Sequence, residues 1–237
     1  MDFYQELSRH YDAIFATSAE DMRFIRDCIP ERAAVLDIGC GTGNKTVHFS
    51  DRASFVEAID LDNGMIARAE SAHARPNIRY AALDMRDVDR TFAGRHFGAI
   101  VCLGNTLVHL LSADAVLDLL KKVRVLLAKD GVFVAQILNY DRILQEHAAS
   151  LPPIETPDVR FLRRYAWENG VMRFVTDLEI KATGETLHND IPLYPLRKQE
   201  LTDLSLRAGF RTPEYFGNYQ GGEHRTDSFV TIAVCRA

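Results

Sequence analysis

Three aspartates stand at the ends of apolar runs in the first part of the chain. Asp37, Asp60 and Asp84 are separated by 23 and 24 residues, and each closes or follows a run of β-branched and apolar residues. One strand and one helix occupy that length, so the three carboxylates are expected along the carboxyl edge of a parallel sheet, where such folds bind ligands. A carboxylate after the second strand can accept both hydroxyls of a ribose, and one after the third can accept from the exocyclic amine of adenine. The spacing therefore predicts an adenosine site.

A glycine-rich turn follows the first of these runs. The stretch 36–44 reads LDIGCGTGN and places Gly39, Gly41 and Gly43 directly after apolar residues. A strand, a glycine-rich turn without side chains and a helix commonly form the binding site of a nucleotide-like ligand. Dinucleotide folds write this turn G-x-G-x-x-G, and Asn44 stands where the third glycine belongs. The turn is therefore out of register for a pyrophosphate, and other ligands of the same cradle stay open.

The elements that must position these residues alternate between strands and helices. Short apolar runs separated by helix-like segments are typical of parallel strands joined by right-handed crossovers. One helix is predicted between Ser112 and Asp130, because apolar residues recur there at helical spacing. The five expected strands are residues 33–38, 54–60, 77–83, 97–103 and 131–138.

The pattern changes after residue 150. The segment LPPIETP (151–157) has three prolines in seven residues and is predicted to be a boundary loop, because proline cannot continue a helix. Residues 159–194 contain three extended runs separated by good turn sequences, which predicts an antiparallel meander. The chain is then expected to return to the core through a helix that ends at Gly209. Two last extended runs follow at residues 211–219 and 227–236.

Composition bounds the class of protein. The 237 residues, 47% hydrophobic and 26% charged, fit one sizeable α/β core with an embellishment. A net charge of −5 argues against a protein that holds a phosphate backbone, so no nucleic-acid partner is expected. No segment is apolar over the length of a membrane span, and the amino terminus lacks a signal-peptide pattern, so we expect a cytoplasmic protein with no membrane partner. The four cysteines and eight histidines show no metal-ligand spacing, so neither disulfides nor a bound metal is expected.

Four segments in order carry a family resemblance. They are VLDIGCGTGN (35–44), EAIDLDNGMI (57–66), ALDMRDV (82–88) and FGAIVCLGNTLVHL (97–110). The series resembles the ordered motifs of class I S-adenosylmethionine-dependent methyltransferases, and the likeness covers residues 21–138. It implies a Rossmann-like, doubly wound α/β fold with a mostly parallel seven-stranded sheet, carrying here an inserted antiparallel β meander.

The resemblance also implies a division of the chain. Residues 1–20 would form an amino-terminal lid segment. Residues 21–150 and 196–237 would form the core that binds S-adenosylmethionine, and residues 151–195 an antiparallel cap over the acceptor site.

Each motif has an implied role in cofactor binding. The glycine turn with Asp37 would shape the pocket for the methionine part, Asp60 would hold the ribose, and Asp84 would bind the adenine edge. A sulfonium cofactor has no phosphates, so a turn open to a small zwitterion suffices and the missing third glycine is no defect. The other residues implied in cofactor binding are Gly39, Cys40, Gly41, Gly43, Leu61, Met65, Met85, Leu103 and Gly104.

Two details refine the match. The family often carries an acidic residue at the start of the fourth strand, where this chain has Gly98. The segments HYDAIF (10–15), GNTLVHL (104–110) and LNYDRIL (138–144) also resemble the subgroup that includes glycine N-methyltransferase and amino-sugar N-methyltransferases. A nitrogen acceptor is therefore slightly favoured over oxygen.

Few residues stand out on the acceptor side. Tyr11 would fold over the cofactor by the subgroup resemblance, although it could equally be a packing residue of an amphipathic helix. His109 could act as a base near neutral pH, although a histidine in LVHLL is more often a packing residue. The arginines of the meander, Arg163 among them, could bind a carboxylate on the substrate or could form the solvent face of a sheet. Asp141 fits a helix start as well as a magnesium ligand. The residues predicted to bind the acceptor are Asn139, Tyr140, Arg164 and Tyr219.

The sequence thus predicts an S-adenosylmethionine-dependent methyltransferase that acts on a small-molecule acceptor by in-line transfer, because an inserted meander would enclose a small substrate. A nucleic-acid base methyltransferase would carry [DN]-P-P-[YF] after the fourth strand, where this chain has LGNTL (103–107). A protein methyltransferase and a noncatalytic cofactor-binding protein also stay open. The oligomeric state is open as well, and the meander could serve as a homodimer surface.

Overall fold

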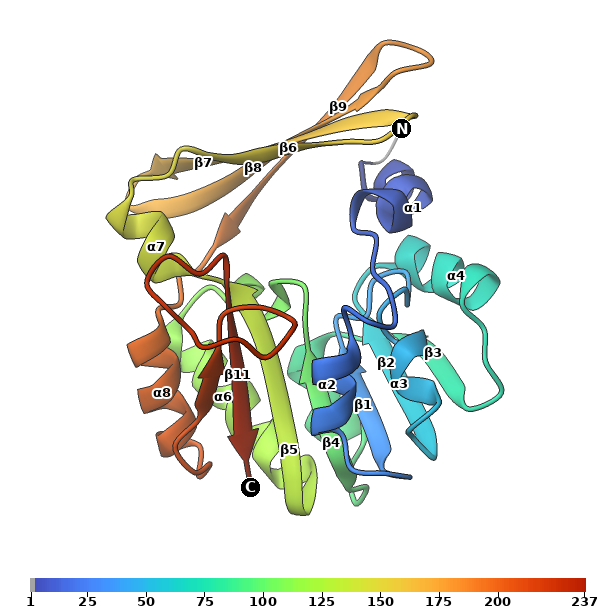
Figure 1. The fold of residues 1–237 in the computed structure, drawn as a ribbon, viewed down its shortest axis with the longest axis vertical. Coiled ribbons are helices and arrows are strands. Elements are labelled where there is room, and N and C mark those ends of the chain that lie inside the picture. Colours follow the sequence, from blue (N-terminus) through green and yellow to red (C-terminus); the bar gives the residue numbers. More distant parts are fainter. Residues whose placement is uncertain (1–2) are drawn as a thin grey trace.

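The computed structural model describes residues 3–237, and its main body is a seven-stranded sheet (Figure 1). The strand order is β10-β11-β5-β4-β1-β2-β3, with β1 to β5 parallel and β10 and β11 forming an antiparallel pair at one edge. The winding reverses between β1 and β4, and a reversal of this kind opens a crevice at the carboxyl ends of the strands. The strands are β1 (Ala34–Ile38), β2 (Phe55–Asp60), β3 (Ile78–Ala82), β4 (Phe97–Cys102), β5 (Leu127–Leu138), β10 (Glu214–Phe216) and β11 (Val230–Arg236).

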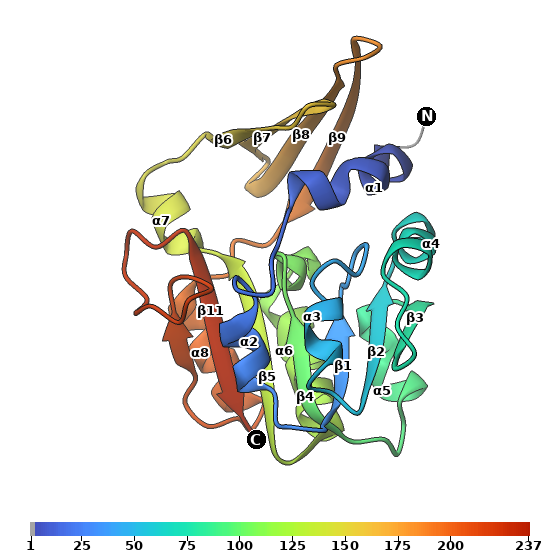
Figure 2. The same ribbon diagram turned by 45° about the vertical axis from the view of Figure 1, so that its right-hand side comes forward.

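Helices cover both faces of this main sheet, as Figures 1 and 2 show. Each face is sealed by an apolar cluster, because strands buried on both sides must present apolar residues to both layers. One face is covered by α2 (Arg23–Cys28), α3 (Val47–Ser50) and α4 (Asn63–Ala72), and the other by α5 (Val88–Thr91), α6 (Ala113–Leu126) and α8 (Lys198–Arg207). Two short 3-10 turns, η1 (Met85–Asp87) and η2 (Thr106–His109), follow β3 and β4.

A second, four-stranded antiparallel sheet lies above the carboxyl ends of the main sheet (Figures 1 and 2). We call it the upper sheet; α7 (Tyr140–Gln145) leads into it from β5. The chain returns at η2, where the Tyr194 N–H donates to the Val108 carbonyl at 2.9 Å. Its strands, in spatial order, are β6 (Ser150–Glu155), β7 (Val159–Glu168), β8 (Val171–Ile180) and β9 (Glu185–Leu193).

The amino-terminal helix α1 (Phe3–Ile14) lies between the two sheets (Figure 2). Phe3 and Leu7 pack with Met65 of α4 and with Phe161 and Leu178 of the upper sheet in a third apolar cluster. This cluster joins three segments that are far apart in sequence. The upper sheet and α1 therefore enclose the space above the strand ends instead of leaving it open.

The fold class predicted from the sequence is confirmed, but two local predictions were wrong. The helix expected to reach residue 130 ends at Leu126, because Leu127 already pairs with Phe97 in the main sheet. Residues 151–157 are largely not a loop: Pro152 and Pro153 lie in β6, so the meander of three strands is a sheet of four. Proline is tolerated there because β6 is an edge strand.

No helix among residues 3–237 is long and apolar enough to cross a membrane. The four cysteines are free thiols, three of them buried.

The packing of the main sheet leaves little room for a side chain at Gly98. A Cβ added there would lie 2.7 Å from the Cβ of Ala33, beside the start of β1. That space excludes the acidic side chain that the family often carries at this position. The departure from the family pattern is therefore a consequence of close packing.

We predict that Gly98→Ala lowers the free energy of unfolding by about 1–3 kcal/mol, since an extra carbon in a well-packed site forces neighbouring atoms apart. Thermal and urea denaturation would measure the loss. Ala33→Gly removes the methyl group that opposes the new Cβ. The double variant should therefore be nearly as stable as Ala33→Gly alone. Additive losses in the double variant would contradict this explanation.

Candidate active site

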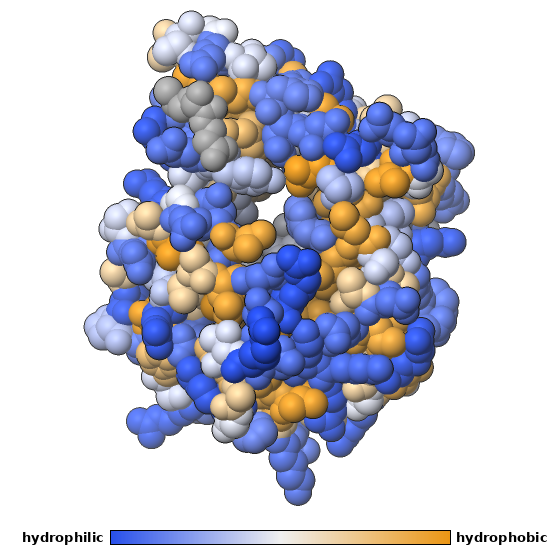
Figure 3. Space-filling model, turned by 180° about the vertical axis from the view of Figure 1, so that it is seen from behind, coloured by the Kyte–Doolittle hydropathy of each residue, from blue (hydrophilic) through white to orange (hydrophobic). Residues whose placement is uncertain are grey.

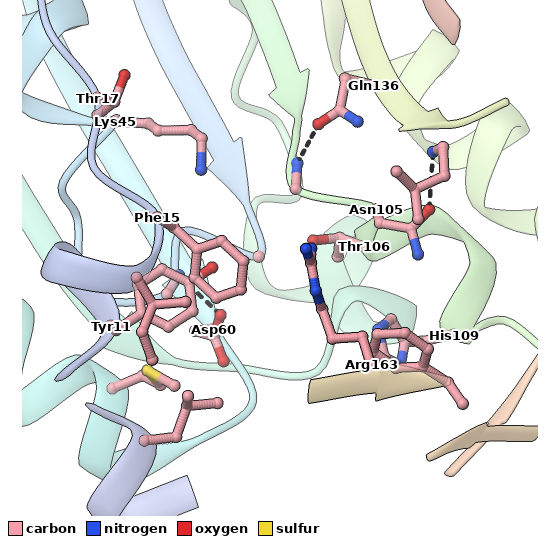
Figure 4. A pocket seen from close by; sticks show the side chains of 18 of the residues that line it. Tyr11, Phe15, Thr17, Lys45, Asp60, Asn105, Thr106, His109, Gln136 and Arg163 are labelled. Carbon is pink, nitrogen blue, oxygen red and sulfur yellow. Dashed lines mark hydrogen bonds between the residues drawn. The ribbon is translucent and has the colours of Figure 1, made fainter. Parts of the chain in front are cut away.

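A cavity of about 930 Å³ lies between the carboxyl ends of the main sheet and the upper sheet. Figure 3 shows an opening between the upper part of the molecule and the main body. The cavity wall combines α1, the glycine turn, the ends of β2, β3 and β4, and the inner face of the upper sheet (Figure 4). Its volume is near the top of the range of about 300–1,000 Å³ that ligand pockets span, so it can hold a cofactor together with a second small molecule.

The glycine turn after β1 is anchored to the end of β2. The N–H groups of Gly39 and Cys40 both donate to the Ile59 carbonyl, at 2.7 and 2.9 Å. Gly39 has a φ of +74°, and a Cβ there would collide with the side chain of Thr106. Only glycine therefore allows β1 to turn this closely beneath η2.

Asp60 holds the turn from the other side. Its Oδ2 accepts from the Gly41 N–H at 2.8 Å and its Oδ1 accepts from the Asp62 N–H at 3.0 Å. Each carboxylate oxygen keeps a second lone pair, and Asp60 lines the cavity. Burial raises the pKa of Asp60 although the two N–H donors oppose that shift. The arrangement can accept hydrogen bonds from two neighbouring hydroxyl groups.

The other two strand-end aspartates differ in environment. Asp84 lines the main cavity, and Arg86 holds its pKa below the usual range through hydrogen bonds from its guanidinium. Asp37 is buried and accepts a 2.6 Å hydrogen bond from Thr46 Oγ1, and burial raises its pKa to about 6. It lines a small side pocket together with Cys40 and Leu103.

Lys45 was missed by the sequence analysis. Its side chain lines both the main cavity and the side pocket, and Figure 4 shows it directed into the cavity near Thr17. Burial lowers its pKa against the attraction of Asp37 and Asp12. Across residues 3–237 no carboxylate lies within ion-pair distance of its ammonium. The segment GTGNK (41–45) shows a lysine beside the glycine turn, but not that its side chain is partly buried.

The amino-terminal segment is tied down over the glycine turn. Asn44 donates to the Phe15 carbonyl at 2.9 Å, and Asp12 accepts from Thr42 Oγ1 while its other oxygen lies 2.9 Å from His73 Nε2. Asn44, which stands where dinucleotide-binding folds have their third glycine, therefore anchors the amino-terminal segment. Tyr11 lies above the turn, where a Cβ on Gly41 would be 3.5 Å from its ring.

The two predicted catalytic residues both line the cavity. Burial raises the pKa of Tyr11, so its hydroxyl stays protonated at neutral pH. His109 is exposed to the cavity, and desolvation by the surrounding wall lowers its pKa, which favours the neutral imidazole that can accept a proton. The two residues project from α1 and η2, on different walls of the cavity (Figure 4).

Gln136 is a second residue that the sequence analysis missed. Its Oε1 accepts from the Gly104 N–H at 2.8 Å and from the Tyr219 hydroxyl at 2.6 Å. Tyr219 lines the cavity as predicted. Gln136 thereby fixes the loop after β4 and the loop after β10 to one strand, β5, which forms part of the floor.

Three predicted acceptor residues do not line the cavity. Asn139 donates to the carbonyls of Thr226 and Ser228, at 3.1 and 3.0 Å, and so holds the loop before β11. The Tyr140 hydroxyl is buried against Asn105, which donates to it at 3.0 Å. Arg164 lies on the outer face of the upper sheet, and its guanidinium is bonded to Asp177 at 2.6 Å.

The predicted cofactor residues fall into three groups. Gly39, Gly41, Asp60, Leu61, Met65, Asp84, Met85 and Gly104 line the main cavity. Asp37, Cys40 and Leu103 line the side pocket, whereas Gly43 lies outside both and faces Tyr80.

No cluster of potential metal ligands occurs in the described part of the chain. Asp141, the residue considered for magnesium, accepts from Arg197 at 2.7 Å and from the Lys198 N–H at 2.9 Å. Its carboxylate therefore fixes the start of α8.

Comparison with known proteins shows which family the chain resembles. Residues 35–131 match a model described as a methyltransferase domain. The chain is 27% identical over 227 residues to a glycine/sarcosine N-methyltransferase of Aphanothece halophytica, covering 93% of this chain and 83% of that protein. It is 28% identical over 144 residues to dTDP-3-amino-3,6-dideoxy-alpha-D-glucopyranose N,N-dimethyltransferase of Streptomyces fradiae, covering 57% and 54% of the two chains.

The fold comparison agrees. An S-adenosylmethionine-dependent methyltransferase from Clostridium acetobutylicum superposes with a TM-score of 0.80 at 16% identity, over 99% of each chain. The resemblance inferred from four short motifs is thus supported by the domain match, by curated relatives and by the fold. Residues 35–131 thus carry a methyltransferase domain, and the comparisons together support a class I S-adenosylmethionine-dependent methyltransferase.

Proposed function

We propose that this enzyme methylates an amine nitrogen of a small molecule that binds beneath the upper sheet. The observation that carries the proposal is the single cavity that joins the strand-end carboxylates to the inner face of the upper sheet. The relatives named above are N-methyltransferases of glycine and sarcosine and of an amino sugar, which favours nitrogen as the acceptor atom. A folded RNA, a DNA duplex or a protein surface is not favoured, because α1 and the upper sheet enclose the site.

The residues of the cavity fit S-adenosylmethionine. The free lone pairs of Asp60 suit the two ribose hydroxyls, and Asp84 with Met85 suits the adenine edge. Asp37 suits the ammonium of the methionine part, and the unpaired Lys45 suits its carboxylate. A buried charge without a partner is costly, so a ligand that brings an opposite charge to each of these residues gains affinity from both.

When bound, the cofactor supplies a methyl group made electrophilic by a positively charged sulfur. The chain's own residues orient the acceptor and exclude water, which can supply much of the rate of an in-line displacement. An amine attacks only as the free base, and the neutral His109 imidazole is the proposed proton acceptor. Tyr11 keeps its proton and closes the turn from above.

The division of the chain follows from these roles and remains a proposal. Residues 1–20, of which 1 and 2 lie outside the described part of the chain, serve as a lid over the glycine turn. Residues 21–150 and 196–237 serve as the cofactor-binding core, and residues 151–195 as the cap over the acceptor. The hydrogen bond from Asn44 to Phe15 and the contacts of Phe161 with α1 support this assignment.

The proposal is tested by measuring S-adenosylhomocysteine release with pairs of small metabolites that differ only in an amine or a hydroxyl at one position. We predict release with at least one amine and a rate at least about tenfold lower with its hydroxyl counterpart, because a hydroxyl is a weaker nucleophile at neutral pH. Binding of the cofactor without turnover on any amine, or turnover confined to the hydroxyl compounds, would contradict the assignment of nitrogen.

The role of Lys45 has a separate test. We predict that Lys45→Met weakens binding of S-adenosylhomocysteine by about tenfold or more, because one charge-assisted contact to the carboxylate is lost. The matched probe is 5′-methylthioadenosine, which has no amino-acid part, and its affinity should change by less than about twofold. Calorimetry with both ligands decides the question: an equal loss for both would show that Lys45 shapes the pocket without binding the carboxylate.

A further inference from the structure

A row of polar side chains crosses the inner face of the upper sheet. Arg163 of β7 lies directly opposite Thr176 of β8, and Thr176 lies directly opposite Asn189 of β9. All three line the cavity. Directly opposite residues of antiparallel strands place their side chains side by side on one face, so the three form a continuous polar row.

The surroundings of this row are apolar. On one side Phe161 pairs with Leu178, and on the other Phe174 pairs with Ile191. Phe161, Phe174 and Ile191 also line the cavity. A polar row placed between apolar rows on a buried face costs free energy unless its groups find partners.

Partners are missing for the central groups. Arg163 Nε and Thr176 Oγ1 are both buried and make no hydrogen bond within residues 3–237. The guanidinium of Arg163 donates once, from Nη2 to the Pro152 carbonyl at 2.7 Å, although it carries five N–H groups. Figure 4 shows its side chain reaching into the cavity from the upper sheet.

On the outer face of the same sheet, arginines form ion pairs with acidic residues. Arg164 pairs with Asp177 at 2.6 Å, Arg173 with Asp190 at 2.9 Å, and Arg160 with Glu155 at 3.2 Å. Arg163 forms no ion pair within the described chain, although it is more buried than Arg164. The acidic residues of the cavity wall belong to the strand ends, to α4 and to the segment after α1, not to the upper sheet.

We propose that Arg163, Thr176 and Asn189 form an anion-binding subsite, so that the methyl acceptor carries an anionic oxygen group and an apolar body in addition to its amine. The guanidinium edge of Arg163 can bind two oxygens of a carboxylate or phosphate side by side, and Thr176 can donate a further hydrogen bond. The flanking Phe161, Phe174 and Ile191 offer apolar surface to the rest of the molecule. The proposal rests on the function proposed above, because it places the acceptor beneath the upper sheet.

Calorimetric titration of simple probes into the protein saturated with S-adenosylhomocysteine tests this subsite. Phenylacetate and phenyl phosphate carry the anion and an apolar ring, and phenylacetamide is the neutral match. We expect at least one anion to bind about tenfold or more tightly than phenylacetamide, since hydrogen bonds to a charged group are lost in the amide. Tighter binding of phenylacetate assigns a carboxylate on the acceptor, and tighter binding of phenyl phosphate assigns a phosphate ester.

Variants show whether the row itself is responsible. Arg163→Gln should abolish the preference for the anion, and Thr176→Val should reduce it by a smaller factor. Arg164→Gln is the matched control, because it removes an arginine from the next position of β7 on the outer face, and the preference should persist. Binding of S-adenosylhomocysteine by each variant reports that the core is folded.

Several outcomes would overturn the subsite. They are equal binding of acid and amide by the unaltered protein, binding of neither, persistence of the preference in Arg163→Gln, and equal losses in Arg163→Gln and Arg164→Gln. Failure of the unaltered protein to bind S-adenosylhomocysteine would instead contradict the function proposed above. The two failures are therefore distinguishable in one set of titrations.

Discussion

The Gly41 N–H donates a 2.8 Å hydrogen bond to the Asp60 carboxylate. This bond joins the glycine turn to the end of β2, and the rest of the site depends on it. One end belongs to the turn after β1 and the other to the end of β2, and the parallel register of these strands brings them together. The carboxylate thus holds the glycine turn with one lone pair, accepts from the Asp62 N–H with a second, and keeps two lone pairs for a ligand in the cavity. A single side chain thus shapes the glycine turn and, in the proposed function, also binds the ribose.

The cavity wall next to the glycine turn contains two charged residues that are wholly or partly removed from water. Asp37 is buried and Lys45 is partly buried, and desolvation shifts the pKa of each toward its neutral form. Neither charge is neutralised by an ion pair in the described residues. This arrangement costs stability in the protein alone and favours a zwitterionic ligand, which matches each charge with its opposite. The same reasoning applies on the opposite wall, where Arg163 is a partly buried cation whose buried Nε makes no hydrogen bond within the described residues.

The sequence predicted the main sheet well and placed the strand-end residues that line the cavity, because both depend on local patterns. Strand-end carboxylates such as Asp60 follow from the spacing of apolar runs, and the glycine turn follows from residue type. The residues that the upper sheet contributes to the cavity wall were predicted less well, because they depend on which face of a strand a residue occupies. Arg163 and Arg164 are neighbours in sequence, yet only the cross-strand register shows that Arg163 faces the cavity and Arg164 faces Asp177.

Two further residues that were predicted to bind the acceptor do not line the cavity, for a physical cause of the same kind. Asn139 and Tyr140 follow β5 as expected, but tertiary hydrogen bonds direct their side chains away from the cavity, to the loop before β11 and to Asn105. Residue type and position in the chain do not carry that information. Lys45 was overlooked because its burial arises from contacts with distant segments.

The central claim is that Asp60 binds the ribose of S-adenosylmethionine at the end of β2. Calorimetric titration of the cofactor into the unaltered protein and into Asp60→Ala tests it most directly, with the thermal unfolding of both proteins recorded beside it. We expect the substitution to weaken binding by about 100-fold or more, because two hydrogen bonds to a charged group are lost, while the protein remains folded. Unchanged affinity in a folded Asp60→Ala protein, or no binding by the unaltered protein, would contradict the claim.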